Sequence, residues 1–146
     1  DKLYIGNLEA LRDWGHARDY VEGMWRILQH DRPDDWVLAT GEAHSVREFI
    51  ERAFAEVGRT VVWRGQESEE IGLDQRTGQT LVQVDQRYYR PLEVDHLLGD
   101  ARKARDELGW QASTRFADLV REMVQADRET LKLEQAGGRL IREAAE

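Results

Sequence analysis

The chain has 146 residues, of which 40% are hydrophobic and 34% are charged, and its mean hydropathy is −0.71. A chain of this size buries one modest core, so we expect one soluble globular domain or a piece of a larger one. The formal net charge of −8 argues against general binding to nucleic acid, and no apolar run approaches the roughly 20 residues that a membrane helix requires. The absence of cysteine excludes a disulfide framework and fits a reducing compartment, so we expect the cytoplasm.

The first 40 residues predict a strand, a helix and a second strand. Residues 3–5 form a short apolar run that ends at a Gly-Asn turn. From residue 17 to residue 29, apolar side chains recur at helical spacing, which predicts an amphipathic helix. Residues 36–39 are continuously apolar and lead into Thr40-Gly41, so we predict a buried strand there.

The middle of the chain predicts a capped helix followed by strands. Ser45 and Glu48 have the spacing of a capping box at the start of a helix over 46–57, and Gly58 is placed to end that helix with positive φ. Residues 61–63 and 81–84 predict strands. The polar, glycine-punctuated segment 65–78 between them predicts a loop or a hairpin tip.

A loop and two helices are expected in the last third of the chain. Residues 85–91 predict a loop, because Pro91 biases Arg90 toward an extended backbone. Helices are predicted over 101–108 and 116–131, with Gly109 closing the first and Thr114 capping the second. After Gly137-Gly138, residues 139–146 are expected to be a frayed helix or the remnant of a tag.

Several kinds of catalytic site are excluded by pattern. The four histidines lack metal-ligand spacing, so we expect no metal. A Gly-x-Gly-x-x-Gly sequence is absent, so any dinucleotide must be held mainly by residues outside this chain. The Tyr-x-x-x-Lys pair of short-chain dehydrogenases is also absent, and helix capping explains Ser45 better than nucleophilic catalysis. We therefore assign no catalytic residue.

Two segments, 12–16 and 87–93, combine arginine with aromatic residues. Guanidinium groups bind phosphate oxygens in a bidentate manner, and aromatic faces stack on a base or a sugar. Either segment alone is better explained by ordinary surface ion pairs, which contribute little free energy.

Read together and in order, these segments resemble the C-terminal part of the GDP-mannose 4,6-dehydratases, a family of extended short-chain dehydrogenases/reductases. The resemblance extends to about residue 131. Arg-Asp-Trp recurs across related sugar-nucleotide enzymes, but its combination with Ala-Thr-Gly-Glu and Arg-Pro-x-Glu-Val-Asp is specific to this family. The matching stretches are 6–8, 12–17, 19–21, 39–42, 45–47, 84–85, 90–95, 97–100 and 108–110.

The resemblance implies an α/β fold, namely the C-terminal portion of an NAD(P)-binding, Rossmann-like extended short-chain dehydrogenase with a small α+β substrate-binding lobe. Residues 1–41 would contribute the last helix and strand of the dinucleotide-binding domain. Residues 42–134 would form the GDP-sugar lobe, and 135–146 the tail. NADP would be held mainly by an N-terminal domain that is absent here.

The activity implied by the resemblance is the conversion of GDP-mannose to GDP-4-keto-6-deoxymannose, a lyase reaction in which bound NADP takes up hydride and returns it. By the same resemblance, Arg12, Arg90 and Glu93 line the substrate site. The two arginines would clamp the pyrophosphate, and Glu93 would accept hydrogen bonds from ribose hydroxyls. Because the family's catalytic residues lie upstream of Asp1, we expect the 146-residue chain alone to be inactive. We also expect the full enzyme to be a homo-oligomer, a dimer or a tetramer.

Two departures from the family pattern concern positions near the site. Leu92 stands where the family usually has a small residue, which could alter how Glu93 is presented, and the segment 66–79 varies in length within the family. Two alternatives stay open. The chain could be a non-catalytic nucleotide-sugar-binding or interaction module, or part of a related nucleotide-sugar dehydratase, epimerase or reductase.

Overall fold

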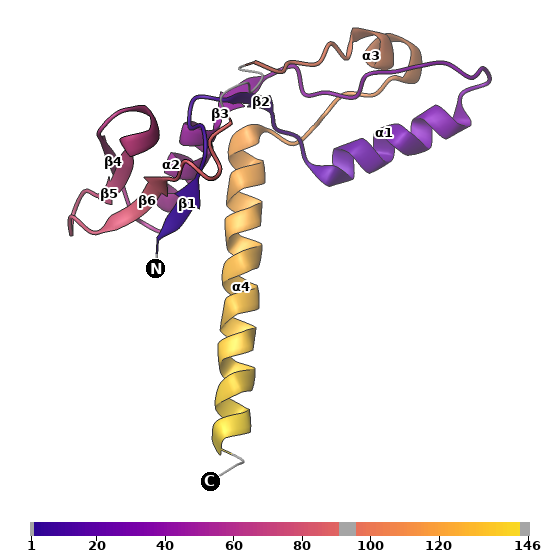
Figure 1. The fold of residues 1–146 in the computed structure, drawn as a ribbon. Helices are drawn as coiled ribbons and strands as arrows, with labels where there is room; N and C mark the ends of the chain where they lie inside the picture. Colours follow the sequence, from indigo (N-terminus) through magenta and orange to yellow (C-terminus); the bar gives the residue numbers. More distant parts are fainter. Residues whose placement is uncertain (1, 91–95, 144–146) are drawn as a thin grey trace.

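The structure, a computed structural model, describes residues 2–90 and 96–143. Its main sheet has the strand order β1-β6-β5-β4, and a separate two-stranded ribbon pairs β2 with β3 (Figure 1). In the main sheet, β1 (Leu3–Ile5) runs parallel to β6 (Thr80–Val84), whereas β5 (Ile71–Asp74) runs antiparallel to both β6 and β4 (Val61–Arg64). The strands expected at 3–5, 61–63 and 81–84 are thus confirmed.

Helix α2 (Val46–Glu56) covers the main sheet, and its predicted caps are confirmed. The Ser45 hydroxyl accepts a 3.1 Å hydrogen bond from the Glu48 amide, and Gly58 ends the helix at φ 73°. The Glu48 carboxylate takes part in other contacts, with His44 and Arg52. Side chains from the loop after β1, the helix and the strands then form the core of the sheet lobe, our name for the main sheet and α2: Leu8, Ile50, Val61, Leu81, Val82 and Val84.

The prediction of a loop over 65–78 is only partly right. A 3₁₀ helix, η1 (Glu67–Glu69), and strand β5 occupy most of that segment, and the hairpin tip is confined to 75–78. Gly72 weakened the strand pattern, yet the fold needs glycine there, because a Cβ would lie 2.8 Å from Val61 Cγ1. At the tip, the Asp74 carboxylate accepts hydrogen bonds from two backbone amides.

The other side of the molecule, which we call the arm, consists of helix α1 (Ala17–Gln29), residues 30–40 and helix α3 (Arg102–Leu108) (Figure 1). Both helices confirm their predictions, and Gly109 closes α3 at φ 61°. Arg26 joins the two helices by donating from Nη1 to the Leu108 carbonyl oxygen at 3.1 Å.

The buried strand predicted at 36–39 is wrong. These residues belong to no strand of the described chain, and Val37 is 52% exposed. Only Ala39 is buried, against Gly99, where an added Cβ would lie 2.3 Å away. An apolar run becomes a strand only when a neighbouring backbone supplies hydrogen bonds, and the described chain supplies none here.

Helix α4 (Phe116–Glu143) is much longer than the predicted 116–131 and projects away from the rest of the molecule (Figure 1). Residues 135–143 of the expected tail are therefore helical. The Arg115 carbonyl accepts the first helical hydrogen bonds, from the Asp118 and Leu119 amides, so Thr114 lies one residue too early to be the cap. Among the described residues, no helix is long and apolar enough to cross a membrane.

Candidate functional site

Arg12 lies on the two-stranded ribbon at the junction between the arm and the sheet lobe. It is the central residue of β2 (Leu11–Asp13) and stands opposite His44 of β3 (Ala43–Ser45). On the other side of β2, Leu11 forms a parallel bridge with His96. Arg12 is half-buried, and its Nη1 donates to the Leu11 carbonyl oxygen at 2.8 Å. The arginine thus projects from a backbone that is paired on both sides.

Arg90 lies in the predicted loop after β6, where it is exposed, and Glu93 is outside the described residues. The loop is confirmed over 85–90, with a turn closed by a 2.9 Å hydrogen bond from the Tyr88 amide to the Asp85 carbonyl oxygen. From Arg90 the chain reaches the bridge to β2 within six residues, a span of at most about 22 Å. Arg90 therefore lies no farther than this span from the residue that bridges to the strand of Arg12.

Arg87 shows the more ordinary behaviour of an arginine in this loop. Its Nη2 donates to Asp85 Oδ2 at 2.6 Å, and this side-chain hydrogen bond lowers the pKa of the Asp85 carboxyl. Arg87 is largely exposed, so the pair contributes little to stability. For this residue the interpretation as a surface ion pair is confirmed.

Asp13, next to Arg12, fixes the turn that leads into β3. Its Oδ1 accepts from the Thr40 amide at 2.9 Å and from the Thr40 hydroxyl at 2.7 Å, and its Oδ2 accepts from the Gly41 amide at 3.0 Å. Sequence reasoning assigned Asp13 no role. Its partners lie 27 and 28 residues away, and no local pattern joins them.

Asp19 performs a similar task for the segment before α4. It is buried in α1 and accepts from the Ser113 hydroxyl at 2.8 Å, the Ser113 amide at 3.2 Å and the Thr114 amide at 2.9 Å. Burial alone would raise the pKa of Asp19, but the hydrogen bonds from Thr114 and Ser113 outweigh it and hold the pKa below the ordinary value. Its backbone carbonyl also accepts from Trp110 Nε1 at 2.7 Å.

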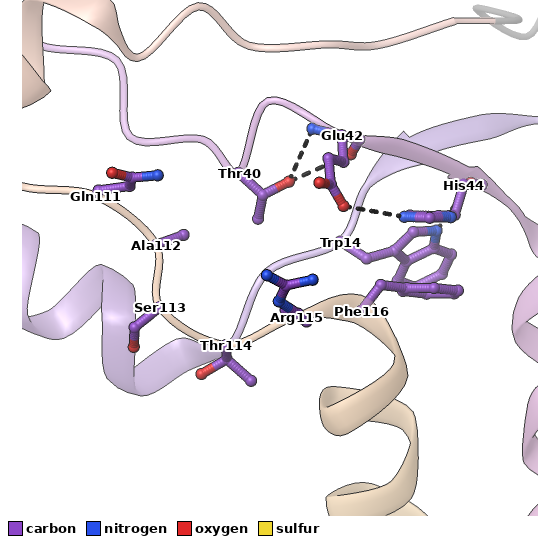
Figure 2. Close-up of a pocket in the computed structure, with 10 residues that line it drawn as sticks. All are labelled: Trp14, Thr40, Glu42, His44, Gln111, Ala112, Ser113, Thr114, Arg115 and Phe116. Atoms are coloured by element: carbon purple, nitrogen blue, oxygen red, sulfur yellow. Dashed lines mark hydrogen bonds and ion pairs between the residues drawn. The ribbon is translucent and has the colours of Figure 1, made fainter.

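These two carboxylates define a cavity of about 330 Å³ beside the ribbon (Figure 2). Asp13 fixes one wall, residues 40–44, and Asp19 fixes the facing wall, residues 111–116. Trp14 lies between them and packs on Phe116, with ring centroids 6.4 Å apart. The cavity is polar, and the Arg115 side chain extends into it without an ion pair to any described residue (Figure 2).

His44 forms the back of this cavity. Its ring stacks on Phe116 at a centroid distance of 4.0 Å and an interplanar angle of 8°. Its Nδ1 lies 2.9 Å from a Glu48 oxygen, and its Nε2 lies 3.7 Å from Glu42 Oε2. Burial alone would raise the pKa of Glu48, but the contacts with His44 and Arg52 lower it overall. The aromatic and acidic neighbours thus hold the residue opposite Arg12 in a fixed orientation.

The side chains around the ribbon offer ligand-binding chemistry chiefly through their guanidinium groups. Within the described part of the chain, no group of three or more histidine, aspartate or glutamate side chains could hold a metal ion. Arg12 on the paired strand and Arg115 in the cavity carry guanidinium groups, which recognise phosphate or carboxylate oxygens.

Comparison with known proteins gives a family match over most of the chain. A sequence model of the family described as GDP-mannose 4,6 dehydratase matches residues 1–123. A GDP-mannose 4,6 dehydratase from Cricetulus griseus is 56% identical over 128 residues, which are 88% of this chain and 34% of that protein. A GDP-mannose 4,6-dehydratase from Sinorhizobium fredii is 59% identical over 125 residues, 86% of this chain and 36% of that protein. The chain thus spans about a third of the length of these relatives.

A solved structure shows the same fold at low sequence identity. RMD from Pseudomonas aeruginosa, in complex with NADPH, superimposes with a TM-score of 0.64 at 17% identity, over 85% of this chain and 35% of that one. The expected fold class, part of an NAD(P)-binding, Rossmann-like extended short-chain dehydrogenase, is confirmed.

Proposed function

Because the chain belongs to the GDP-mannose 4,6-dehydratase family, we propose that it is the GDP-sugar-binding part of an enzyme that converts GDP-mannose to GDP-4-keto-6-deoxymannose. The observation that carries the proposal is the placement of Arg12. Its segment lies within the family match, and its backbone is paired on both sides at the junction of the two parts of the molecule. A guanidinium on such a fixed backbone suits bidentate binding of a pyrophosphate.

Within this function, Arg12 and Arg90 clamp the pyrophosphate and Glu93 accepts hydrogen bonds from ribose hydroxyls. Two observations support the arginines. Arg12 projects from a paired strand, so its backbone is already ordered before a ligand binds. Arg90 is exposed on a loop that returns to that strand, and it is therefore accessible to a ligand at the junction.

We divide the proposed enzyme between the arm and the sheet lobe. The arm exposes one face of α1, made of Val21, Met24, Trp25 and Leu28, and it also contains the segment 36–39, which pairs with no strand of the described chain. An exposed apolar helix face and an apolar segment without strand partners suit a part that packs on a further sheet, so we assign the arm to the dinucleotide-binding part. Leu3–Ile5 goes with the sheet lobe instead, since β1 pairs with β6.

NADP is the proposed cofactor, held mainly by residues outside the chain. The family's structural neighbours include a protein solved with NADPH, and this chain has no Gly-x-Gly-x-x-Gly of its own. The 146 residues alone are then inactive. The enzyme acts in the cytoplasm as a homo-oligomer, a setting with which the absence of cysteine agrees.

Titration calorimetry with GDP-mannose, UDP-glucose and dTDP-glucose tests the substrate class. We expect GDP-mannose to bind selectively and Arg12→Ala to weaken it about 10- to 100-fold, because a hydrogen bond to a charged group contributes about 1.5–3 kcal/mol. Arg12→Lys keeps the charge but not the planar fork, and should recover only part of the affinity. Arg18→Ala is the control, since Arg18 is largely exposed and pairs with Glu122 on α4. Equal binding of the three sugars, or an Arg12→Ala variant with unchanged affinity, would count against the proposal.

A further inference from the structure

We propose that Asp13 and Thr40 form a positioning pair for Arg12, so that the orientation of the phosphate-binding guanidinium depends on a hydroxyl 28 residues away from it in the sequence. This inference deepens the proposed function and rests on it. Neither residue touches the ligand in this account. Both act by fixing the strand from which Arg12 projects.

The contacts of the pair are short and mutually dependent. The Thr40 hydroxyl donates to Asp13 at 2.7 Å, and its oxygen accepts from the Glu42 amide at 3.1 Å (Figure 2 shows the Thr40–Glu42 contacts). The same carboxylate holds the amides of Thr40 and Gly41. Gly41 has φ 79°, a conformation that favours glycine. The side chains of Asp13 and Thr40 thus bind the backbone amides of residues 40–42, which lead into β3.

The turn controls Arg12 through the register of the ribbon. Asp13 pairs with Ala43 and Arg12 with His44, so the turn over 40–42 sets where β3 begins. Directly opposite residues of an antiparallel pair place their side chains on the same face. A slip of one residue would move Arg12 to the other face of the ribbon. The pairing of β2 with β3 covers three residues, so the turn that sets where β3 begins contributes directly to this register.

The carboxylate of Asp13 binds the turn that leads into β3. All of its described hydrogen bonds go to Thr40 and Gly41. A half-buried acceptor that meets neutral donors in fixed directions orients the backbone that carries those donors.

Matched variants at Thr40 test the pair by calorimetric titration with GDP, in the gene product that contains this chain. Thr40→Val keeps the shape and loses the hydroxyl, and we expect GDP affinity to fall about five- to tenfold, because Asp13 loses one of its donors and the strand of Arg12 is held less firmly. Thr40→Ser restores the hydroxyl and should bind within about twofold of the parent chain. Thr77→Val is the control, because the Thr77 hydroxyl serves only the distant β5–β6 hairpin tip.

A double-mutant cycle with Arg12→Ala separates positioning from simple destabilisation. If the pair acts through Arg12, Thr40→Val should cause no further loss of GDP affinity in the Arg12→Ala background. An equal loss in both backgrounds would overturn the inference, because it would reflect general damage to the fold. An unchanged affinity of Thr40→Val, with Arg12→Ala weakened, would overturn the inference and leave the proposed function intact. If the parent chain fails to bind GDP or Arg12→Ala has no effect, the proposed function falls and the inference with it.

Discussion

The sheet lobe and the arm use apolar residues in opposite ways. In the sheet lobe, Leu81, Val82 and Val84 of one strand are all buried, in a core cluster that also contains Ile50 of α2. In the arm, the matching apolar stripe of α1 is exposed, with Leu28 at 80%. The sheet lobe therefore contains its own core, whereas the arm is held by a few specific contacts and keeps an apolar face for another surface. A core of its own is expected of a separate lobe, such as the sheet lobe. An exposed apolar face is expected of a segment that packs on another domain, such as the arm.

Trp110 is the strongest of the few contacts that hold the arm, so its removal should have the largest effect. It is 1% exposed, stacks near Tyr20 and donates to the Asp19 carbonyl oxygen. We expect Trp110→Ala to cost about 3–5 kcal/mol of stability. Hydrogen exchange should show this loss first in α1 and α3, with the amides of the main sheet still protected. Simultaneous loss of protection in both regions would break the comparison.

Asp19 should rank second, with an effect that depends on pH. Asp19→Ala leaves the Ser113 and Thr114 donors unpaired, at a cost of about 2–3 kcal/mol. Because the pKa of Asp19 is lowered in the folded state, its contribution is fully present above the unfolded value of about 3.9 and is lost as the pH falls through the folded value. The free energy of unfolding, measured by denaturant titration, should therefore decrease less steeply with falling pH in Asp19→Asn than in the parent chain. Equal slopes for the two proteins below pH 4 would contradict this account.

Ser45 provides a smaller test within the sheet lobe. Ser45→Ala removes the hydroxyl that caps α2 and should cost about 1 kcal/mol. Since α2 belongs to a region with its own core, the loss should appear as one cooperative shift in thermal melting. Ser45→Asp, which restores a capping oxygen, is the rescue variant. A broadened melting curve for Ser45→Ala would indicate that the sheet lobe is less cooperative than its core suggests.

Deletion of residues 136–146 should have the smallest effect. The described side chains of α4 from Gln125 to Ala136 are exposed, and the family match ends at residue 123. We expect the free energy of unfolding, measured by thermal melting, to change by less than about 0.5 kcal/mol. A larger loss would show that the distal part of α4 contributes to a core or an interface.

Local pattern was enough to locate the helices, although it ended α4 too early, while the errors in the strands depend on distant partners. Helical periodicity placed α1 to the residue, and a serine followed three residues later by glutamate located the start of α2. The run at 36–39 has the composition of a strand but no partner within the described chain, and β5 was hidden by Gly72. Sequence cannot show pairing between segments, which decided both cases.

The candidate site was predictable only in part, for the same reason. Arg12 and Arg90 were selected through the family resemblance, and residue chemistry alone did not separate Arg90 from Arg87, which forms a surface ion pair. Asp13 and Asp19 went unnoticed because their partners lie 27 and 94 residues away. Both aspartates lie next to arginine and aromatic residues in the sequence. Only the fold shows that they fix the two walls of the cavity beside the ribbon.

The most direct test of the proposed enzyme is turnover of GDP-mannose by the gene product that contains this chain, supplied with NADP and followed by mass spectrometry of the nucleotide sugar. The account predicts loss of one water from GDP-mannose, no reaction of UDP-glucose or dTDP-glucose, and no reaction by the 146 residues alone. Selective binding of GDP-mannose without turnover by that gene product would contradict it and identify a binding module. Turnover of a different nucleotide sugar would contradict the substrate and identify a related enzyme of the same fold.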